Sequence, residues 1–174
     1  MNNILFSTNT QKILDFLSAD PGKQFVANEI QKATSASRAG VNVALRQLAI
    51  EKIVLREKKA NIYLYCVEPG NPVIKQQKIL RCTASLTSLV NKIKPCTEKV
   101  VLFGSCSRGE NTPRSDIDIL VISNEPENVK ETISKVKKVQ MVIKTPVQYA
   151  ELKKNDPVFY EEIIRGIVLW EKRE

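Results

Sequence analysis

The stretch FGSCSRGENTPRSDIDILVI, residues 103–122, decides the fold of the second half of the chain. A glycine and a serine, Gly104 and Ser105, come at the end of the apolar run KVVLF. Two aspartates, Asp116 and Asp118, are separated by one residue at the start of a second apolar run. Because alternate residues of a strand point to the same face, this spacing predicts two neighbouring carboxylates, with the glycine turn nearby.

These residue types suit a phosphate site. Paired carboxylate oxygens are ligands for Mg²⁺ or Mn²⁺, and Mg²⁺ normally holds substrate phosphates at the same time. A glycine lets backbone N–H groups approach a phosphate, and the N-terminus of a following helix favours its negative charge. The pattern therefore predicts a site for a metal-bound nucleoside triphosphate. The alternative is a glycine turn and two solvated acids at a strand end.

The same segment resembles the minimal nucleotidyltransferases of the DNA polymerase beta superfamily. Their signature reads Gly-Ser, then Arg-Gly, then Ser-Asp-x-Asp, and this chain matches it without an insertion. The matching residues are Gly104, Ser105, Arg108, Gly109, Ser115, Asp116 and Asp118. The resemblance covers about residues 97–172, where the predicted order of strands and helices, including the ending RGIVLWE, also fits.

The resemblance implies a role for each of these residues. Gly104 and Ser105 would hold the β- and γ-phosphates of a nucleoside triphosphate, ATP foremost. Asp116 and Asp118 would be the catalytic residues and bind two Mg²⁺ (or Mn²⁺) ions. Attack of an acceptor hydroxyl at the α-phosphorus would release pyrophosphate. The implied nucleotide-binding residues are Gly104, Ser105, Arg108 and Ser115. Arg108 is equally well interpreted as a surface arginine on a short helix.

One position departs from the family pattern. A third carboxylate is expected on the neighbouring strand, and Gln140 stands there, within the run Val139–Ile143. A glutamine can ligate through its amide oxygen, but it carries no negative charge and cannot accept a proton at neutral pH. This favours nucleotide binding with one metal ion over two-metal catalysis.

The first part of the chain, about residues 3–68, reads as three helices followed by a hairpin, and resembles a winged helix-turn-helix domain. Thr8 and Gln11 have the spacing of a capping box, and Ser35 or Ser37 caps the third helix. The predicted elements are helices at about 8–17, 26–33 and 37–51 and strands at 53–56 and 62–67, joined by a polar turn at 57–61.

The resemblance implies that this domain binds DNA. Arg38, Asn42 and Arg46 recur every four residues, so they share one exposed helix face, and they suit guanine and adenine edges. Lys58 and Lys59, on the polar turn, would touch phosphate. The alternative is a winged helix used only for protein contacts or dimerisation.

A helix at about 73–94 links the two parts after Pro69-Gly70-Asn71-Pro72. Its apolar residues recur at spacings of three and four, which favours packing on a domain over a homodimer seam. The fold class is therefore α+β: a winged helix at 1–68, a basic linker helix at 69–95, and a polymerase-beta-like nucleotidyltransferase domain at 96–174, with a mixed sheet and flanking helices.

Composition narrows the possible partners. The 174 residues carry a net charge of +8. Residues 69–95 hold five basic and no acidic groups, whereas residues 96–174 hold 13 of each. A basic balance favours polyanionic partners. The absence of histidine excludes mechanisms that depend on it, and the four cysteines lack the spacing of a zinc site or a disulfide framework. No long apolar run or signal peptide is present, so we expect a cytoplasmic protein that does not associate with a membrane.

Two functions fit these observations. The first is an enzyme that transfers a nucleoside monophosphate to a protein or nucleic-acid hydroxyl, and the pairing of Asp116 with Asp118 favours it. The second is a DNA-binding transcriptional regulator whose transferase domain is catalytically degenerate, which Gln140 favours. Small nucleotidyltransferases of this kind also resemble the antitoxins of toxin–antitoxin pairs, whose partner is a helical HEPN protein.

Overall fold

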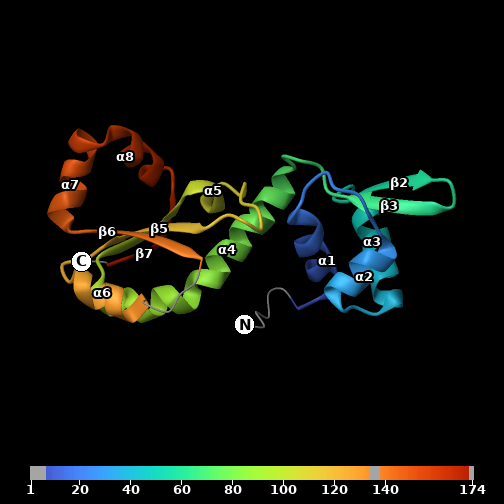
Figure 1. Cartoon of the computed structure of the whole chain (residues 1–174), viewed down its shortest axis with the longest axis horizontal. Helices are drawn as coiled ribbons and strands as arrows, with labels where there is room; N and C mark the ends of the chain where they lie inside the picture. Colours follow the sequence, from blue (N-terminus) through green and yellow to red (C-terminus); the bar gives the residue numbers. More distant parts are fainter. Residues whose placement is uncertain (1–6, 134–137, 173–174) are drawn as a thin grey trace. The chain divides into compact units, whose positions relative to one another are not determined.

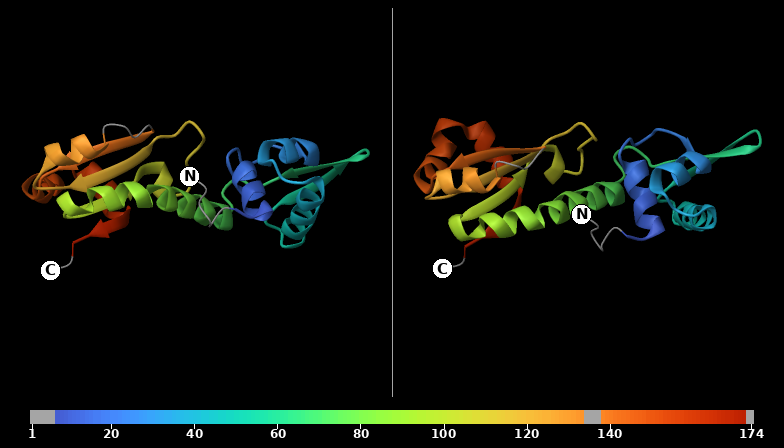
Figure 2. Two further views of the ribbon diagram at one scale, coloured as in Figure 1. Left: turned by 90° about the horizontal axis from the view of Figure 1, so that it is seen from below. Right: turned by 60° about the horizontal axis from the view of Figure 1, so that its bottom comes forward.

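The computed structural model describes residues 7–133 and 138–172. The chain forms two compact units, and the boundary between them lies within one long helix. This helix, α4 (Pro72–Ile93), is continuous in each view of Figures 1 and 2. The division falls between Lys78 and Ile79. None of the helices in the described ranges combines the length and apolar character that crossing a bilayer requires.

The first unit contains the three helices and the hairpin that the sequence predicts. Its elements are α1 (Asn9–Ser18), β1 (Phe25–Val26), α2 (Ala27–Thr34), α3 (Arg38–Ile50), β2 (Leu55–Lys59) and β3 (Ile62–Cys66). The capping box of Thr8 and Gln11 is present, and Ser37 caps α3 by accepting the N–H of Gly40 at 3.1 Å. The strands form an antiparallel sheet in the order β1-β3-β2. The two-residue β1 is too short to leave a periodic signal in the sequence.

The hairpin corrects the prediction of a polar turn at 57–61. Lys59 pairs with Ile62, so only Ala60 and Asn61 form the turn, and Ala60 has a positive φ of 51°. Lys58 and Lys59 therefore lie on a strand rather than in a loop. All five residues of β2 are exposed, so this strand lacks the apolar alternation by which a half-buried strand is recognised.

A single apolar core holds the first unit together. Its fully buried side chains include Ile13, Leu17, Ile30 and Leu45, and Ile74 from the first turn of α4 joins them. Gln77 also ties α4 to α1: it donates to Asp15 at 2.7 Å and accepts from Ser18 at 2.8 Å. The first turns of α4 are thus part of the first unit.

The second unit is built on a four-stranded mixed sheet in the order β6-β5-β4-β7. Strand β4 is antiparallel to β5 and β7, while β5 and β6 run parallel, and this confirms the predicted α+β class with a mixed sheet. The elements are a 3₁₀ turn (Lys94–Cys96), β4 (Lys99–Phe103), α5 (Gly104–Ser107), β5 (Ile117–Ile122), α6 (Pro126–Ile133), β6 (Val139–Lys144), α7 (Pro146–Asn155), α8 (Pro157–Ile164) and β7 (Ile167–Glu171). From the sequence, the helix opened by Glu125-Pro126 is predicted to reach about Lys137, and residues 134–137 of that range lie outside the described residues.

Alternate residues of β4 and β5 divide the core into two layers. Val100, Leu102, Ile119 and Val121 pack with α4 and α6, and their neighbours along each strand pack with α7 and α8 (Figures 1 and 2). The predicted apolar stripe of α4 comprises Ile79, Cys82, Leu86, Leu89 and Ile93. The last four are buried in the first of these layers, whereas Ile79 is half-buried. These positions therefore serve packing within the second unit, as favoured from the sequence.

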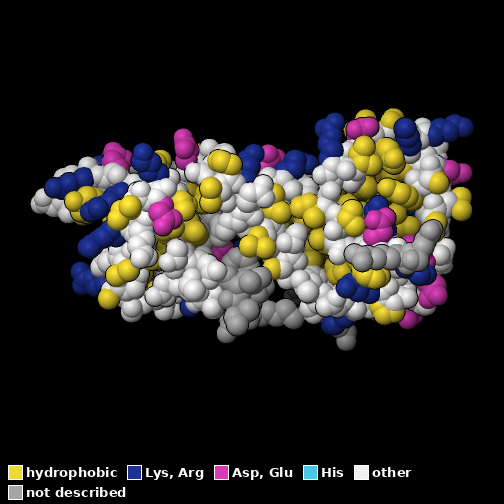
Figure 3. All heavy atoms as spheres, turned by 180° about the vertical axis from the view of Figure 1, so that it is seen from behind, with side chains coloured by type: hydrophobic (Ala, Val, Ile, Leu, Met, Phe, Trp, Pro, Cys, Tyr) yellow, Lys and Arg dark blue, Asp and Glu magenta, His cyan; other side chains and the backbone are white. Residues whose placement is uncertain are grey.

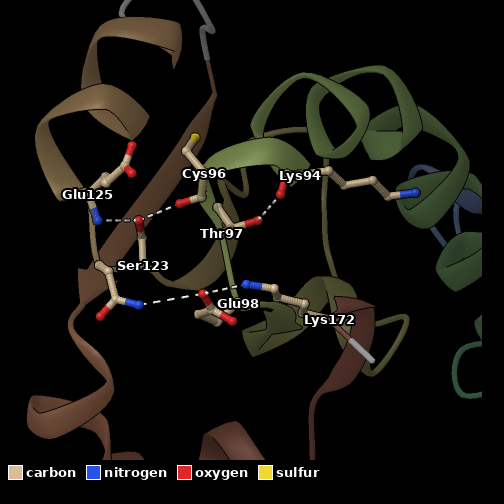
Figure 4. A network of polar contacts seen from close by, with 8 residues as sticks. Lys94, Cys96, Thr97, Glu98, Ser123, Glu125 and Lys172 are labelled. Atoms are coloured by element: carbon tan, nitrogen blue, oxygen red, sulfur yellow. Dashed lines mark hydrogen bonds and ion pairs between the residues drawn. The ribbon is translucent and has the colours of Figure 1, made fainter. Parts of the chain in front are cut away.

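A polar network closes one end of the sheet (Figure 4). Glu98, just before β4, accepts from Lys172 at 3.3 Å and from Asn124 at 3.4 Å. Ser123, just after β5, donates to the carbonyl of Cys96 and accepts the N–H of Glu125 at 2.9 Å. Since β4 begins here and ends at Phe103, the network fixes the end of the sheet that lies away from Gly104.

Candidate active site

Gly104 and Asp118 form the centre of the site. Strand β4 ends at Phe103, which is paired with Asp118 on β5, and α5 begins with Gly104 at a φ of +69°. A Cβ atom on Gly104 would overlap the Oδ2 atom of Asp118. Only glycine therefore both adopts this backbone conformation at little cost and admits the carboxylate. The predicted glycine turn is in fact the start of a one-turn helix.

Asp116 lies close to Asp118, as predicted, although it precedes the strand. β5 begins at Ile117, and the carbonyl of Asp116 accepts a hydrogen bond from the Cys106 thiol at 3.6 Å. Burial raises the pKa of Asp118 above its ordinary value, and the charges of Asp116 and Glu162 raise it further, while Arg108 opposes the change. Two neighbouring negative charges thus act on Asp118, with one positive charge opposing them.

The side chain of Asp118 continues the row that faces α8. Leu120 and Ile122, two and four residues further along β5, pack in the layer beneath α7 and α8. On the parallel strand β6, Gln140 is in register with Asp118, and Val142 belongs to the same layer. The exposed Gln140 therefore stands beside Asp118 at the position predicted from the sequence, and β6 carries no acid.

Arg108 joins two carboxylates at the edge of the site. Its Nε donates to Glu110 at 3.1 Å and its Nη1 donates to Glu162 at 3.2 Å. Glu162 lies on α8 and is not among the predicted site residues. It carries no sequence signal, because α8 reaches the site only through tertiary packing, in which Phe159 meets Phe103 edge to face at 5.4 Å.

Ser105 and Ser115 occupy different environments. The Ser105 hydroxyl has no hydrogen-bond partner among residues 7–133 and 138–172, and it lies on the first turn of α5. The Ser115 hydroxyl accepts the N–H of Thr112 at 2.9 Å, so it closes the loop that leads to Asp116. The structure therefore brings Gly104, Ser105, Asp116 and Asp118 together, whereas the Ser115 hydroxyl is already engaged.

The candidate metal ligands of the site are two carboxylates. No group of three or more Cys, Asp or Glu residues in the described part of the chain is arranged to hold a metal ion. Asp116 and Asp118 supply two carboxylates, and neither accepts a hydrogen bond from another described residue. Mg²⁺ is commonly held by one or two carboxylates together with water and substrate phosphates. The residues present fit that arrangement.

The residues predicted to bind DNA are exposed. Arg38, Asn42 and Arg46 lie on the outer face of α3. Arg38 and Asn42 also line a hollow of about 370 Å³ between α2 and α3, with Ala27, Asn28, Gln31 and Val41. Lys58 and Lys59 lie on β2, where Lys59 contacts Gln24 at 3.3 Å. Lys and Arg side chains gather at the end that carries the β2–β3 hairpin (Figure 3).

A mixed sheet with Gly-Ser after one strand and Asp-x-Asp at the start of the next defines a nucleotidyltransferase domain. The chain belongs to the family described as polymerase beta, nucleotidyltransferase, whose model matches residues 86–174, just over half of the chain. This confirms the predicted family for the second part of the chain.

Comparison with solved structures finds a likeness to a Sulfolobus solfataricus protein inferred to be a nucleotidyltransferase, whose crystal structure was solved at 1.40 Å. The two chains are 19% identical, with a TM-score of 0.42, over 60% of this chain and 93% of that one. Comparison with curated proteins finds no match.

Proposed function

We propose that the second unit binds a nucleoside triphosphate, ATP foremost, with Mg²⁺ (or Mn²⁺) and transfers a nucleoside monophosphate to a hydroxyl of a protein or nucleic acid. The observation that carries this proposal is the contact between Gly104 and Asp118. This contact places the Asp118 carboxylate directly against the backbone of a glycine. The membership of the chain in a nucleotidyltransferase family supports the same proposal.

Each residue of the site has a role in this proposal. Asp116 and Asp118 hold the cation, which when bound neutralises phosphate charge and polarises the reacting phosphoryl group. Gly104 admits the Asp118 carboxylate beside the start of α5, and the first N–H groups of this helix, which have no helical partners, can donate to the β- and γ-phosphates. The Ser105 hydroxyl adds a donor beside them. Positioning and charge neutralisation are the main contributions that such a reaction needs from a protein.

Gln140 sets the expected limit of the reaction. Its amide stands next to Asp118, where a carboxylate would bring a further negative charge and a proton acceptor. We therefore propose that one cation is held with the nucleotide and that the acceptor hydroxyl must lose its proton to another group or to water. The expected consequence is tight nucleotide binding with slow transfer.

We further propose that the first unit is a winged helix-turn-helix that binds DNA. The exposed face of α3, with Arg38, Asn42 and Arg46, and the hollow beside it support this function. Arg and Asn side chains pair with guanine and adenine edges, and the lysines of β2 suit phosphate contacts. In the alternative function, a DNA-binding regulator, the second unit senses a nucleotide without transferring it.

Calorimetric titration tests the nucleotide site directly. ATP, GTP, CTP and UTP are each titrated into the full chain with Mg²⁺ and with EDTA. We expect Mg²⁺-dependent binding of at least one nucleotide, which Asp118→Asn abolishes. Asp20→Asn makes the same chemical change at an exposed residue of the first unit and should leave binding unaltered. Binding that persists in EDTA, or in the Asp118→Asn variant, would contradict the proposed site.

A further inference from the structure

Glu162 is the acid near Asp118 that neither the family signature nor the sequence pattern assigns. It projects from α8, the helix whose Phe159 packs against Phe103 at the end of β4. Gly104 follows Phe103 directly. The edge-to-face contact therefore fixes the position of α8 relative to the residue that contacts Asp118, and so brings Glu162 to the site.

Arg108 has two carboxylate partners. Its guanidinium is held from two sides, by Glu110 in the loop after α5 at 3.1 Å and by Glu162 at 3.2 Å. The side chains of Arg108 and Glu162 are 51% and 40% exposed. Ion pairs this exposed contribute little to the stability of a fold. A role in stability alone therefore does not account for two acids around one arginine.

The geometry of the pair suits phosphate recognition. Arginine carries five N–H donors in a rigid planar fork, and the two acids use one on Nε and one on Nη1. Among residues 7–133 and 138–172 nothing accepts from the other three N–H donors of this guanidinium, whose orientation is set from two directions. Pre-orientation lowers the entropy that a flexible side chain loses when it binds a ligand.

We propose that Glu162 is a positioning residue of the nucleotide site, which with Glu110 holds the guanidinium of Arg108 in place for the phosphates of a nucleoside triphosphate. The inference rests on the proposed function. It adds a role for α8, and it assigns to an acidic side chain a favourable effect on the binding of an anion. That sign is opposite to the effect of its charge alone.

The direction in which ATP affinity changes when Glu162 loses its charge tests this proposal. It is measured by titrating ATP with Mg²⁺ into the full chain. If Glu162 acted only through its charge, Glu162→Gln would strengthen the binding of the anionic nucleotide. If it positions Arg108, Glu162→Gln weakens binding by about threefold to fivefold. In the Arg108→Gln background the same change should cause no weakening, because there is no guanidinium left to orient.

Glu161→Gln is the matched control. Glu161 lies on the same helix, carries the same charge and pairs with Arg165 at 3.6 Å. The Glu161→Gln variant should bind ATP as the wild type does. The Glu162→Gln variant should keep the wild-type unfolding temperature, which separates an effect on positioning from an effect on folding. Tighter binding by Glu162→Gln, an unchanged affinity, or equal weakening in the Arg108→Gln background would overturn the inference alone. A wild type that binds no nucleotide would overturn the proposed function and the inference with it.

Discussion

The missing side chain of Gly104 shapes the candidate site. Its backbone lies in the left-handed region, and the Asp118 carboxylate occupies the place that a Cβ atom would take. Gly104 is therefore required for two separate reasons: its backbone conformation is rarely adopted by other residues, and there is no room for a Cβ atom. Burial raises the pKa of Asp118, and the charges of Asp116 and Glu162 raise it further, so the carboxylate that lies against Gly104 is also the one on which the neighbouring acids act.

Gly104→Ala should lose nucleotide binding and destabilise the fold. Gly70→Ala is the matched control, because Gly70 has a φ of +80° but open space around it. We expect Gly70→Ala to cost about 1–2 kcal/mol of unfolding free energy from the backbone alone. Gly104→Ala should cost more, because it also displaces Asp118. Urea unfolding and ATP titration measure both effects, and equal costs with intact binding would contradict the described contact.

Gln140→Asp should increase nucleotidyl transfer. The substitution places a carboxylate in register with Asp118 on the parallel strand, where a second cation and a proton acceptor become possible. We expect a rise on the order of tenfold in the rate of label transfer from ATP. Gln76→Asp, on the exposed surface of α4, introduces the same charge elsewhere and should leave the rate unchanged. A rate that does not rise would mean that Gln140 is not what limits the reaction.

At the scale of elements, the site depends on how closely α8 approaches β4. Gly166 separates α8 from β7, and a Cβ atom there would lie 2.6 Å from the carbonyl oxygen of Leu102 and 2.9 Å from that of Ile163. Carbonyl groups of a strand and a helix cannot move aside separately from their elements. A small residue at 166 therefore lets α8, with Phe159 and Glu162, pack against the sheet.

Gly166→Ala should destabilise the second unit. Because the new methyl group meets two backbone carbonyl groups as well as the side chain of Val101, we expect a loss of about 1–3 kcal/mol of unfolding free energy. Urea unfolding measures it. An unfolding free energy equal to that of the wild type would show that α8 does not pack this closely on β4.

The elements show where sequence reasoning succeeds. Strand β4 and the apolar part of β5 are continuous apolar runs, so the pattern predicts strands at 99–103 and 116–122, within a residue of the observed bounds. β2 was displaced toward the chain start, because its charged, wholly exposed residues resemble a loop. Glu162 was missed, because only the packing of Phe159 on Phe103 brings it to the site. The spacing of nearby residues identifies the signature residues, whereas contacts between residues far apart in the sequence leave no such local pattern.

At the scale of the whole molecule, the net charge is distributed unevenly along the chain. The net charge of +8 arises from residues 1–95, since residues 96–174 are neutral in sum. Basic surface provides the part of nucleic-acid binding that is independent of sequence and falls with salt. We therefore expect any DNA affinity of the full chain to depend on residues 1–95, which comprise the first unit and the rest of helix α4.

Lys58→Ala with Lys59→Ala should weaken DNA binding evenly across sequences. If both lysines contact phosphate, the slope of log affinity against log salt should fall by about 2. Lys153→Ala with Lys154→Ala removes the same charge from exposed positions of α7 and should leave the slope unaltered. Electrophoretic mobility shifts over a range of salt concentrations measure it. An equal slope in the two double variants would contradict a role of β2 in binding phosphate.

The most direct test of the proposed transferase activity is label transfer from ATP labelled at the α-phosphate. The full chain is incubated with the nucleotide, Mg²⁺ or Mn²⁺, and an extract of the source cells, beside an Asp116→Asn/Asp118→Asn variant. We expect label on a protein or nucleic acid with the wild type only, which would identify the acceptor class. No label above that variant, with all four nucleotides tried, would contradict a transferase and favour a nucleotide-sensing domain in a DNA-binding regulator.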